Sequence, residues 1–292
     1  MLSANATTPL HRPDGAAAGN PAERAFRFLQ ELAADLSQEA ITFPTFVDAT
    51  IRIGRALDDP TMDADRLALV VSSEPLLAAK LVQLANSVSF NPAGRKIADV
   101  KTAVTRVGFT SVRSTAAAVA LAQVRESNDL KEFRPEAERV WRHSIDVAAN
   151  AYVLARTVPS MRPDEALFAG LVHDIGRFYL LARATRYPEL TAYRDELDSV
   201  ILEWHPAIGQ AILQQLSLPE NLTTAVAEHE VSAPRVPARN LTDLVVLANL
   251  AARVREGRAP LEPGAGLAAD SPVIKVLDDA RAELAALTAA LR

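Results

Sequence analysis

Four of the five histidines of this sequence lie between residues 143 and 229, and one of them is followed directly by an aspartate. They are His143 in WRHS, His173 with Asp174 in GLVHDIG, His205 in EWHPAIG and His229 in AEHE. Neutral imidazoles and carboxylates are good ligands for divalent metal ions of hard to borderline character. These residue types therefore predict a candidate metal site made of His143, His173, Asp174, His205 and His229.

The adjacent pair His173 and Asp174 needs a particular backbone if both side chains are to bind one ion. Side chains of neighbouring residues on a helix diverge by about 100°, so both reach a common point only where the helix ends. Gly176 follows two residues after Asp174 and predicts such an end. The chain contains no cysteine, which excludes thiolate zinc sites, iron–sulfur clusters and disulfides. Any metal would have to be held by histidine and carboxylate.

The charge balance argues against nucleic acid and anionic membranes as partners, although a local basic patch could still bind them. The chain has 31 Lys plus Arg against 36 Asp plus Glu, and so a formal net charge of −5. It has no overall positive field with which to hold nucleic acid or an anionic membrane surface. The first residues, MLSANATTPLHRPDG, lack the apolar segment of a signal peptide, and the longest uncharged apolar run, 114–124, is shorter than the roughly 18 residues of a membrane span. We expect a cytoplasmic protein that binds neither nucleic acid nor membrane directly.

The elements that must position the histidines are predicted to be helices. Aromatic residues make up 5% of the chain, alanine is abundant, and no segment alternates polar and apolar residues for long enough to form a strand. In the first half, helix starts are marked by Pro21, Pro75, Asp99 and Thr110. The sequence therefore predicts an all-α fold, a multi-helix globule with short connections.

The second half repeats these signals, and Gly257 is expected to end one of its helices. Further helix starts are predicted at Pro135, Pro163, Pro206, Pro219, Asn240 and Pro272. We divide the chain into a disordered arm (1–20), a helical domain (21–257), and a loop with a C-terminal helix (258–292). The apolar face of that last helix is expected to pack on the domain or on a partner, with a homodimer as one outcome.

Several phrases of the sequence carry a family resemblance. The GLVHDIG phrase, with a helical histidine 30 residues before its own, resembles the HD superfamily of metal-dependent phosphohydrolases. The other phrases are FPTF at 43–46, SSEPLLAAKLVQLANS at 72–87, AVTRVG at 103–108, and the later HPAIGQAIL and LPENLTTAVAEHE. Together they resemble the HDOD domain, the HD-related output domain of bacterial signalling proteins. The resemblance covers residues 38–232 and implies an all-helical fold.

For catalytic HD proteins, the resemblance implies one or two metal ions held by His143, the His173–Asp174 pair and a distal aspartate, sometimes with further histidines. At the expected place of that aspartate, in DLVVLANLAARV, this chain has Asn249. A neutral amide neither balances the charge of a metal nor accepts a proton from water. Arg177 replaces the lysine that usually follows the HDIG segment, and its guanidinium could bind a phosphate.

The resemblance implies two alternative functions. HD-type phosphodiesterases that cleave cyclic dinucleotides carry a histidine pair, a glutamate and a Gly-Tyr-Pro motif, whereas this chain reads EHE and then VSAPRVP at 228–237, which disfavours that reaction. HDOD domains imply a non-catalytic regulatory protein that acts through protein partners in signal transduction. The alternative is a metal-dependent phosphohydrolase acting on a nucleotide or phosphodiester. The four histidines could hold a divalent metal ion without turnover, support hydrolysis, or form a structural cluster without any cofactor.

Overall fold

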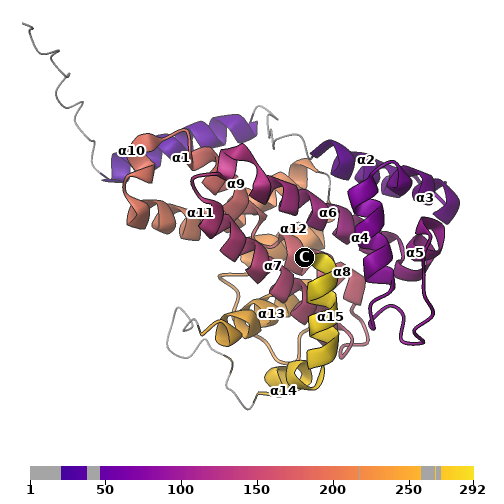
Figure 1. Ribbon diagram of the computed structural model, residues 1–292. Coiled ribbons are helices and arrows are strands. Elements are labelled where there is room, and N and C mark those ends of the chain that lie inside the picture. The colour runs from indigo at the N-terminus through magenta and orange to yellow at the C-terminus, as the bar shows by residue number, and fades with distance from the viewer. Residues whose placement is uncertain (1–20, 38–46, 217, 258–266, 268–270) are drawn as a thin grey trace, which may run out of the picture.

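A computed structural model describes residues 21–37, 47–216, 218–257, 267 and 271–292, and every regular element in these ranges is a helix (Figure 1). The all-α prediction is confirmed, whereas the predicted disordered arm at 1–20 lies outside the described residues. The elements are α1 (Pro21–Ser37), α2 (Val47–Asp58), α3 (Ala64–Ser72), α4 (Pro75–Ala85), α5 (Val100–Val107), α6 (Phe109–Glu126), the 3-10 helix η1 (Asn128–Leu130), α7 (Arg134–Ala155), α8 (Pro163–Val172), α9 (Ile175–Ala184), α10 (Pro188–Thr191), α11 (Arg194–Gln215), α12 (Glu220–Glu228), α13 (Leu241–Arg255), α14 (Pro272–Asp279) and α15 (Arg281–Leu291).

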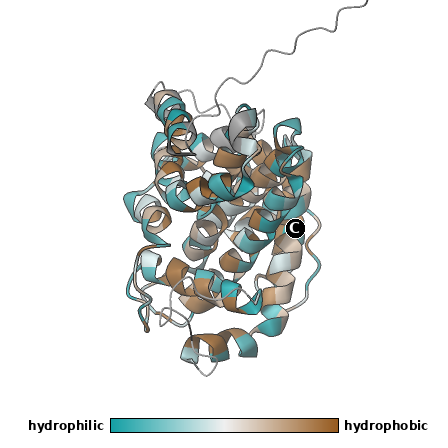
Figure 2. Ribbon diagram, turned by 90° about the vertical axis from the view of Figure 1, so that its left-hand side faces the viewer, coloured by the Kyte–Doolittle hydropathy of each residue, from teal (hydrophilic) through white to brown (hydrophobic). Residues whose placement is uncertain are grey.

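The long helix α7 lies in the middle of the molecule, between two groups of helices (Figure 1). Helices α2 to α6 form one group, and α1 packs with α10 and α11 at the opposite end. The last helix, α15, contacts α7, α4 and α6, so it connects the first and second halves of the chain. Brown and teal residues occur along the same helices in Figure 2, as expected for amphipathic helices that share one core. Within the described ranges, no helix combines the length and apolar character required to cross a membrane.

Side-chain caps explain several helix starts. The Asp99 side chain accepts a hydrogen bond of 2.8 Å from the backbone N–H of Thr102, and Asn240 accepts one of the same length from Asp243. These bonds satisfy amide groups that have no partner inside the first turn of a helix. The helix starts predicted at Asp99 and Asn240 are confirmed.

Four predicted boundaries are wrong. Pro206 lies inside α11 instead of beginning a helix. Gly176 lies in the first turn of α9 and does not itself end a helix, although the helix end expected beside His173 and Asp174 is present, because α8 ends at Val172. Thr110 is the second residue of α6 and not its cap, and the last predicted helix is divided at Ala280 into α14 and α15. The first two differences bear directly on the histidines, because both residues are next to the positions where His173 and His205 lie.

Helices α7 and α8 pack so closely that their backbones are in contact. A Cβ atom added to Gly170 on α8 would lie 2.7 Å from the Cα of Ala148 on α7, well inside the ordinary contact distance. Glycine is therefore required at this position. This close packing brings the ring of His143 on α7 to within 5.4 Å of the ring of His173, measured between ring centroids.

Candidate metal centre

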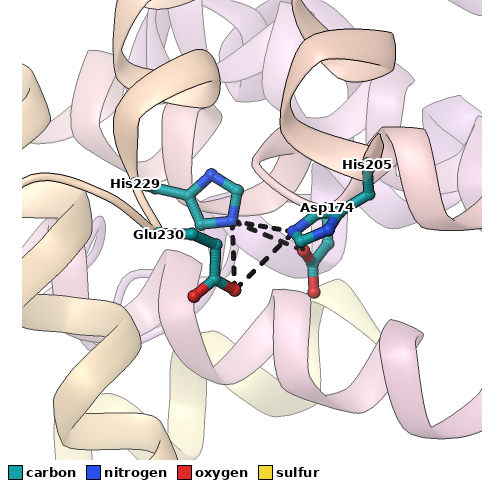
Figure 3. A group of neighbouring side chains, drawn as sticks. All are labelled: Asp174, His205, His229 and Glu230. Atoms are coloured by element: carbon teal, nitrogen blue, oxygen red, sulfur yellow. Dashed lines mark hydrogen bonds and ion pairs between the residues drawn. The ribbon is translucent and has the colours of Figure 1, made fainter. Parts of the chain in front are cut away.

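The end of α8, the start of α9, the middle of α11 and the end of α12 meet at one buried centre. His173 caps the end of α8, Asp174 precedes α9, His205 lies within α11, and His229 caps the end of α12. Glu230, which follows His229 directly, adds a second carboxylate (Figure 3). The three histidines and Asp174 are almost completely buried. The structure thus brings together four of the five predicted residues and one that was not predicted.

The three imidazoles present the same nitrogen to the centre. Each ring has its Nδ1 in hydrogen-bond contact with a backbone carbonyl one turn earlier: His173 with Gly170 (2.7 Å), His205 with Ile201 (2.9 Å) and His229 with Val226 (2.7 Å). A carbonyl oxygen only accepts, so Nδ1 carries the proton and the Nε2 of the neutral ring is left with a lone pair. Metal-binding histidines are commonly oriented in this way by a partner at the second nitrogen.

Pro206 explains the orientation of His205. Proline has no N–H, so the carbonyl of Leu202, four residues earlier in α11, cannot receive its usual helical hydrogen bond. The Nδ1 of His205 lies 3.0 Å from that oxygen and donates to it instead. The proline therefore frees a second acceptor for Nδ1 beside the carbonyl of Ile201, and the two carbonyls together hold the ring toward the centre.

Gly176 explains how Asp174 reaches His205. A Cβ atom at Gly176 would lie 2.0 Å from the backbone oxygen of His205 and 2.9 Å from the backbone nitrogen of Gly209. The start of α9 therefore touches the backbone of α11, which only a residue without a side chain allows. Asp174, two residues before Gly176, is thereby placed with its Oδ1 3.2 Å from the Nε2 of His205.

Four potential ligand atoms lie within 4.8 Å of one another: Asp174 Oδ1, Glu230 Oε1, and the Nε2 atoms of His205 and His229 (Figure 3). The two Nε2 atoms are 3.2 Å apart, His229 Nε2 lies 3.6 Å from Asp174 Oδ1, and Glu230 Oε1 lies 3.6 Å from each Nε2. A tetrahedral ion with bonds of about 2.0–2.1 Å separates its ligand atoms by about 3.3 Å. The side chains therefore fit one divalent ion of the size of Zn²⁺.

Two arginines compensate the charge of the two carboxylates. Arg177 donates from Nε to Asp174 Oδ1 at 2.9 Å and from Nη2 to Glu230 Oε1 at 3.3 Å, and Arg253 donates from Nη2 to the same oxygen of Glu230. Burial opposes ionisation of Asp174, but Arg177 and the surrounding imidazoles hold its pKa well below the usual value. Burial also opposes ionisation of Glu230, yet the neighbouring imidazoles of His205 and His229 and the charge of Arg253 lower its pKa. Both carboxylates are anionic at neutral pH.

Two of the histidines differ in their protonation. Burial lowers the pKa of His173 to about 3, so this ring stays neutral. Its Nε2 has no hydrogen-bond partner among the described residues and lies 3.5 Å from Asp174 Oδ2. Burial disfavours the charged form of His229 too, but hydrogen bonds to Asp174 and Glu230 raise its pKa to about 9. In the absence of a metal, His229 therefore carries a second proton, on the Nε2 that faces Asp174 Oδ1 and Glu230 Oε1.

His143 lies beside the centre, with both ring nitrogens held by other side chains. Its Nδ1 is 2.9 Å from Glu256 Oε1, and its Nε2 is 2.9 Å from Asn249 Oδ1. Together with His173 and Asp174 it forms a second group of potential ligands that shares Asp174 with the first. Asn249 occupies the position where the family resemblance implies a distal aspartate. Its side-chain oxygen contacts the Nε2 of His143 and does not add a charged ligand to this group.

A pocket of about 130 Å³ opens beside the two groups of ligands. His143, Asp174, Arg177 and Arg253 contribute to its lining. The predicted phosphate-binding residue, Arg177, therefore faces a space that a small ligand could enter, although its guanidinium is bonded to Asp174 and Glu230. Whether it binds phosphate stays a prediction.

Sequence reasoning missed Glu230, Arg253 and Glu256. Glu230 had a usable signal, because it follows His229 at a helix end just as Asp174 follows His173. Arg253 and Glu256 had none, since each meets the centre only through the packing of α13 against α7 and α12.

Comparison with known proteins agrees with the helical fold and with the family resemblance of the sequence segments. A family model described as the HDOD domain matches residues 43–232. The chain belongs to the HDOD domain family. A candidate metal-dependent phosphohydrolase of Shewanella amazonensis is similar in structure, with a TM-score of 0.71 and 22% identity over 92% of this chain and 100% of that one. An HDOD domain protein of unknown function from Geobacter sulfurreducens has a TM-score of 0.65 and 20% identity over 94% and 99% of the two chains.

Two further relatives of this HDOD chain are longer than it is. A candidate signal transduction protein of Marinobacter aquaeolei has a TM-score of 0.58 and 21% identity over 93% of this chain and 68% of that one. An uncharacterized protein of Treponema pallidum is 26% identical over 251 residues, which cover 80% of this chain and 46% of the relative. The HDOD chain thus spans less than half the length of that relative. At these identities the structural similarities establish the shared HD-like helical fold.

Proposed function

We propose that this HDOD chain is a non-catalytic regulatory protein of bacterial signal transduction, acting in the cytoplasm through protein contacts, and that its buried centre holds one divalent metal ion. The observation that carries the proposal is the set of four protein ligand atoms around one point, from Asp174, His205, His229 and Glu230. Structural metal sites are closed by four protein ligands, whereas catalytic zinc sites keep one position open for water.

The second group of ligands supports the same proposal. A hydrolase with two metal ions would need a ring nitrogen of His143 that is free to bind the second ion, and an anionic residue at the position of Asn249. Both nitrogens of His143 are bonded, to Asn249 and to Glu256, so release of a ligand atom would break one of these bonds. The first group remains complete without them.

In this proposal the ion would fix the relative positions of α9, α11 and α12, because its ligands come from the start of α9, the middle of α11 and the end of α12. Metal binding would thus be coupled to the arrangement of the helical domain, proposed to span 21–257, and of the C-terminal part, 258–292. Protein partners, a second copy of the chain included, would recognise that arrangement. Nucleic acid and membranes are not among the proposed partners.

The second candidate function is a metal-dependent phosphohydrolase that acts on a nucleotide or phosphodiester. It is favoured by the unpartnered Nε2 of His173 and by the pocket that reaches His143 and Asp174. Arg177 would then contact a phosphate group.

Metal analysis combined with an activity screen tests the two candidates. The full chain is loaded with Zn²⁺ or Mn²⁺, dialysed, analysed for metal, and assayed with phosphomonoesters, phosphodiesters and cyclic dinucleotides. We expect one ion per chain and no turnover above a metal blank. Asp174→Asn should lose the ion, whereas Asp195→Asn, a change at an exposed position of α11, should keep it. Turnover that disappears in Asp174→Asn would establish the second candidate, and a wild-type chain that takes up no metal would exclude the proposed centre.

A further inference from the structure

One carboxylate oxygen of Glu230 contacts two guanidinium groups and two imidazole nitrogens. Its Oε1 accepts from Arg253 Nη2 and Arg177 Nη2 and also faces the Nε2 atoms of His205 and His229. The side chains of Glu230 and Arg253 are only 11% and 13% exposed, so water screens their interaction weakly. The atom that would bind the metal is the same atom that binds the guanidinium of Arg253.

We propose that Arg253 is an internal competitor of the metal ion, which holds Glu230 in the metal-free protein and weakens metal binding. This inference rests on the proposed metal centre. In the metal-free protein the charges of Asp174 and Glu230 are already balanced by Arg177 and Arg253. A divalent ion bonded to Oε1 adds two positive charges next to these guanidinium groups, and charges of the same sign repel strongly at partly buried positions.

Arg253 and Arg177 differ in how they contact the two carboxylate ligands. Arg177 bonds to both carboxylates and lies in α9, the helix that also carries Gly176, so it contributes to the positions of both ligands. Arg253 reaches in from α13, and Glu230 is its ion-pair partner among the described residues. Removal of the Arg253 charge should therefore leave Glu230 in place through Arg177 while it takes away a repulsive neighbour.

Competition between the metal ion and Arg253 for Glu230 would couple metal binding to the contact between α12 and α13. Glu230 follows α12, whereas Arg253 is in α13, which lies beyond the residues 43–232 that the family model matches. Metal binding would weaken the link between these two helices and loosen the end of α13, which packs on α7 and α14. The occupancy of the centre would thus be transmitted to a part of the chain outside the HDOD match.

The test compares Zn²⁺ binding by the full-length wild type with Arg253→Gln and Arg253→Lys, using a competing chelator. Arg253→Gln removes the charge, and we expect at least tenfold tighter Zn²⁺ binding together with a lower Tm of the metal-free protein. Arg253→Lys keeps the charge and should bind Zn²⁺ within about threefold of the wild type. Arg255→Gln is the matched control on the same helix, because Arg255 bonds to Asn150 and Asp278 away from the centre.

In Arg253→Gln, a lower Tm with a higher Zn²⁺ affinity would indicate competition. If Arg253 only positioned Glu230 for the metal, both the Tm and the Zn²⁺ affinity would fall. Unchanged or weaker Zn²⁺ binding in Arg253→Gln, with a wild type that binds one ion, would overturn this inference alone. If neither the wild type nor any variant binds Zn²⁺, the proposed function fails instead. Hydrogen exchange of the wild type is a second measurement that needs no variant: residues 253–257 should exchange faster after Zn²⁺ is added, and slower exchange there would contradict release of Arg253.

Discussion

Gly176→Ala should damage the metal centre without touching any ligand. The new Cβ would lie 2.0 Å from the backbone oxygen of His205, whereas ordinary contacts begin at 3.4 Å. The start of α9 and the backbone of α11 must therefore move apart by about 1.4 Å. Because Asp174 is carried by the start of α9, its Oδ1 should move from 3.2 Å to more than about 4 Å from the Nε2 of His205.

Two effects of opposite sign determine the stability of Gly176→Ala. Alanine in place of glycine favours a helix by about 1 kcal/mol, but overpacking against a backbone that cannot rotate away costs about 1–3 kcal/mol or more. We expect the free energy of unfolding to fall by about 2 kcal/mol and Zn²⁺ affinity to fall at least tenfold. Thermal unfolding of the metal-free protein and chelator competition measure these two quantities.

Gly54→Ala is the matched control. Gly54 lies inside α2, and nothing is within 4 Å of the position that its Cβ would take. This variant should be as stable as the wild type or more stable by up to about 1 kcal/mol, and its Zn²⁺ affinity should be unchanged. Wild-type stability and Zn²⁺ affinity in Gly176→Ala would refute the argument that the backbone contact between α9 and α11 places Asp174.

Two other substitutions test separate steps of the argument. Pro206→Ala returns an N–H donor to the carbonyl of Leu202, so the Tm should rise. Zn²⁺ affinity should fall by less than about tenfold, because the Nδ1 of His205 keeps the carbonyl of Ile201 and loses only its second acceptor. Calorimetry and chelator competition check both, and unchanged affinity would contradict the role of the proline. Phe28→Ala removes a buried ring that packs edge-on against Tyr187 at 5.1 Å between centroids. It should weaken docking of α1 by about 3 kcal/mol, seen as faster hydrogen exchange in α1 with unchanged Zn²⁺ affinity, whereas unaltered exchange would contradict it.

The parts of the fold that depend on local sequence were predictable. The helical composition, the caps at Asp99 and Asn240 and the helix start at Pro75 each act within one turn, and the structure confirms them. The gathering of His173, Asp174, His205 and His229 followed from residue types together with the family resemblance. Three of the five histidine and aspartate residues predicted for the site, Asp174, His205 and His229, belong to the four-ligand group, whereas His143 and His173 lie beside it and form a second group with Asp174.

The parts that depend on contacts between helices were not predictable. Gly176 was read as a helix end, but its function is to let α9 touch α11, and a single sequence contains no sign of that contact. Pro206 was read as a helix start because proline favours first turns, whereas the chain keeps it inside α11 with His205 donating to the freed carbonyl. Arg253 reaches Glu230 only because α13 packs beside α12.

Anomalous X-ray scattering from crystals of the Zn²⁺-loaded full chain tests the central claim most directly. We predict one anomalous peak per chain, enclosed by Asp174, His205, His229 and Glu230. A peak between His143 and His173 instead, or no peak at the centre in crystals grown with Zn²⁺, would contradict a single ion held by these four side chains.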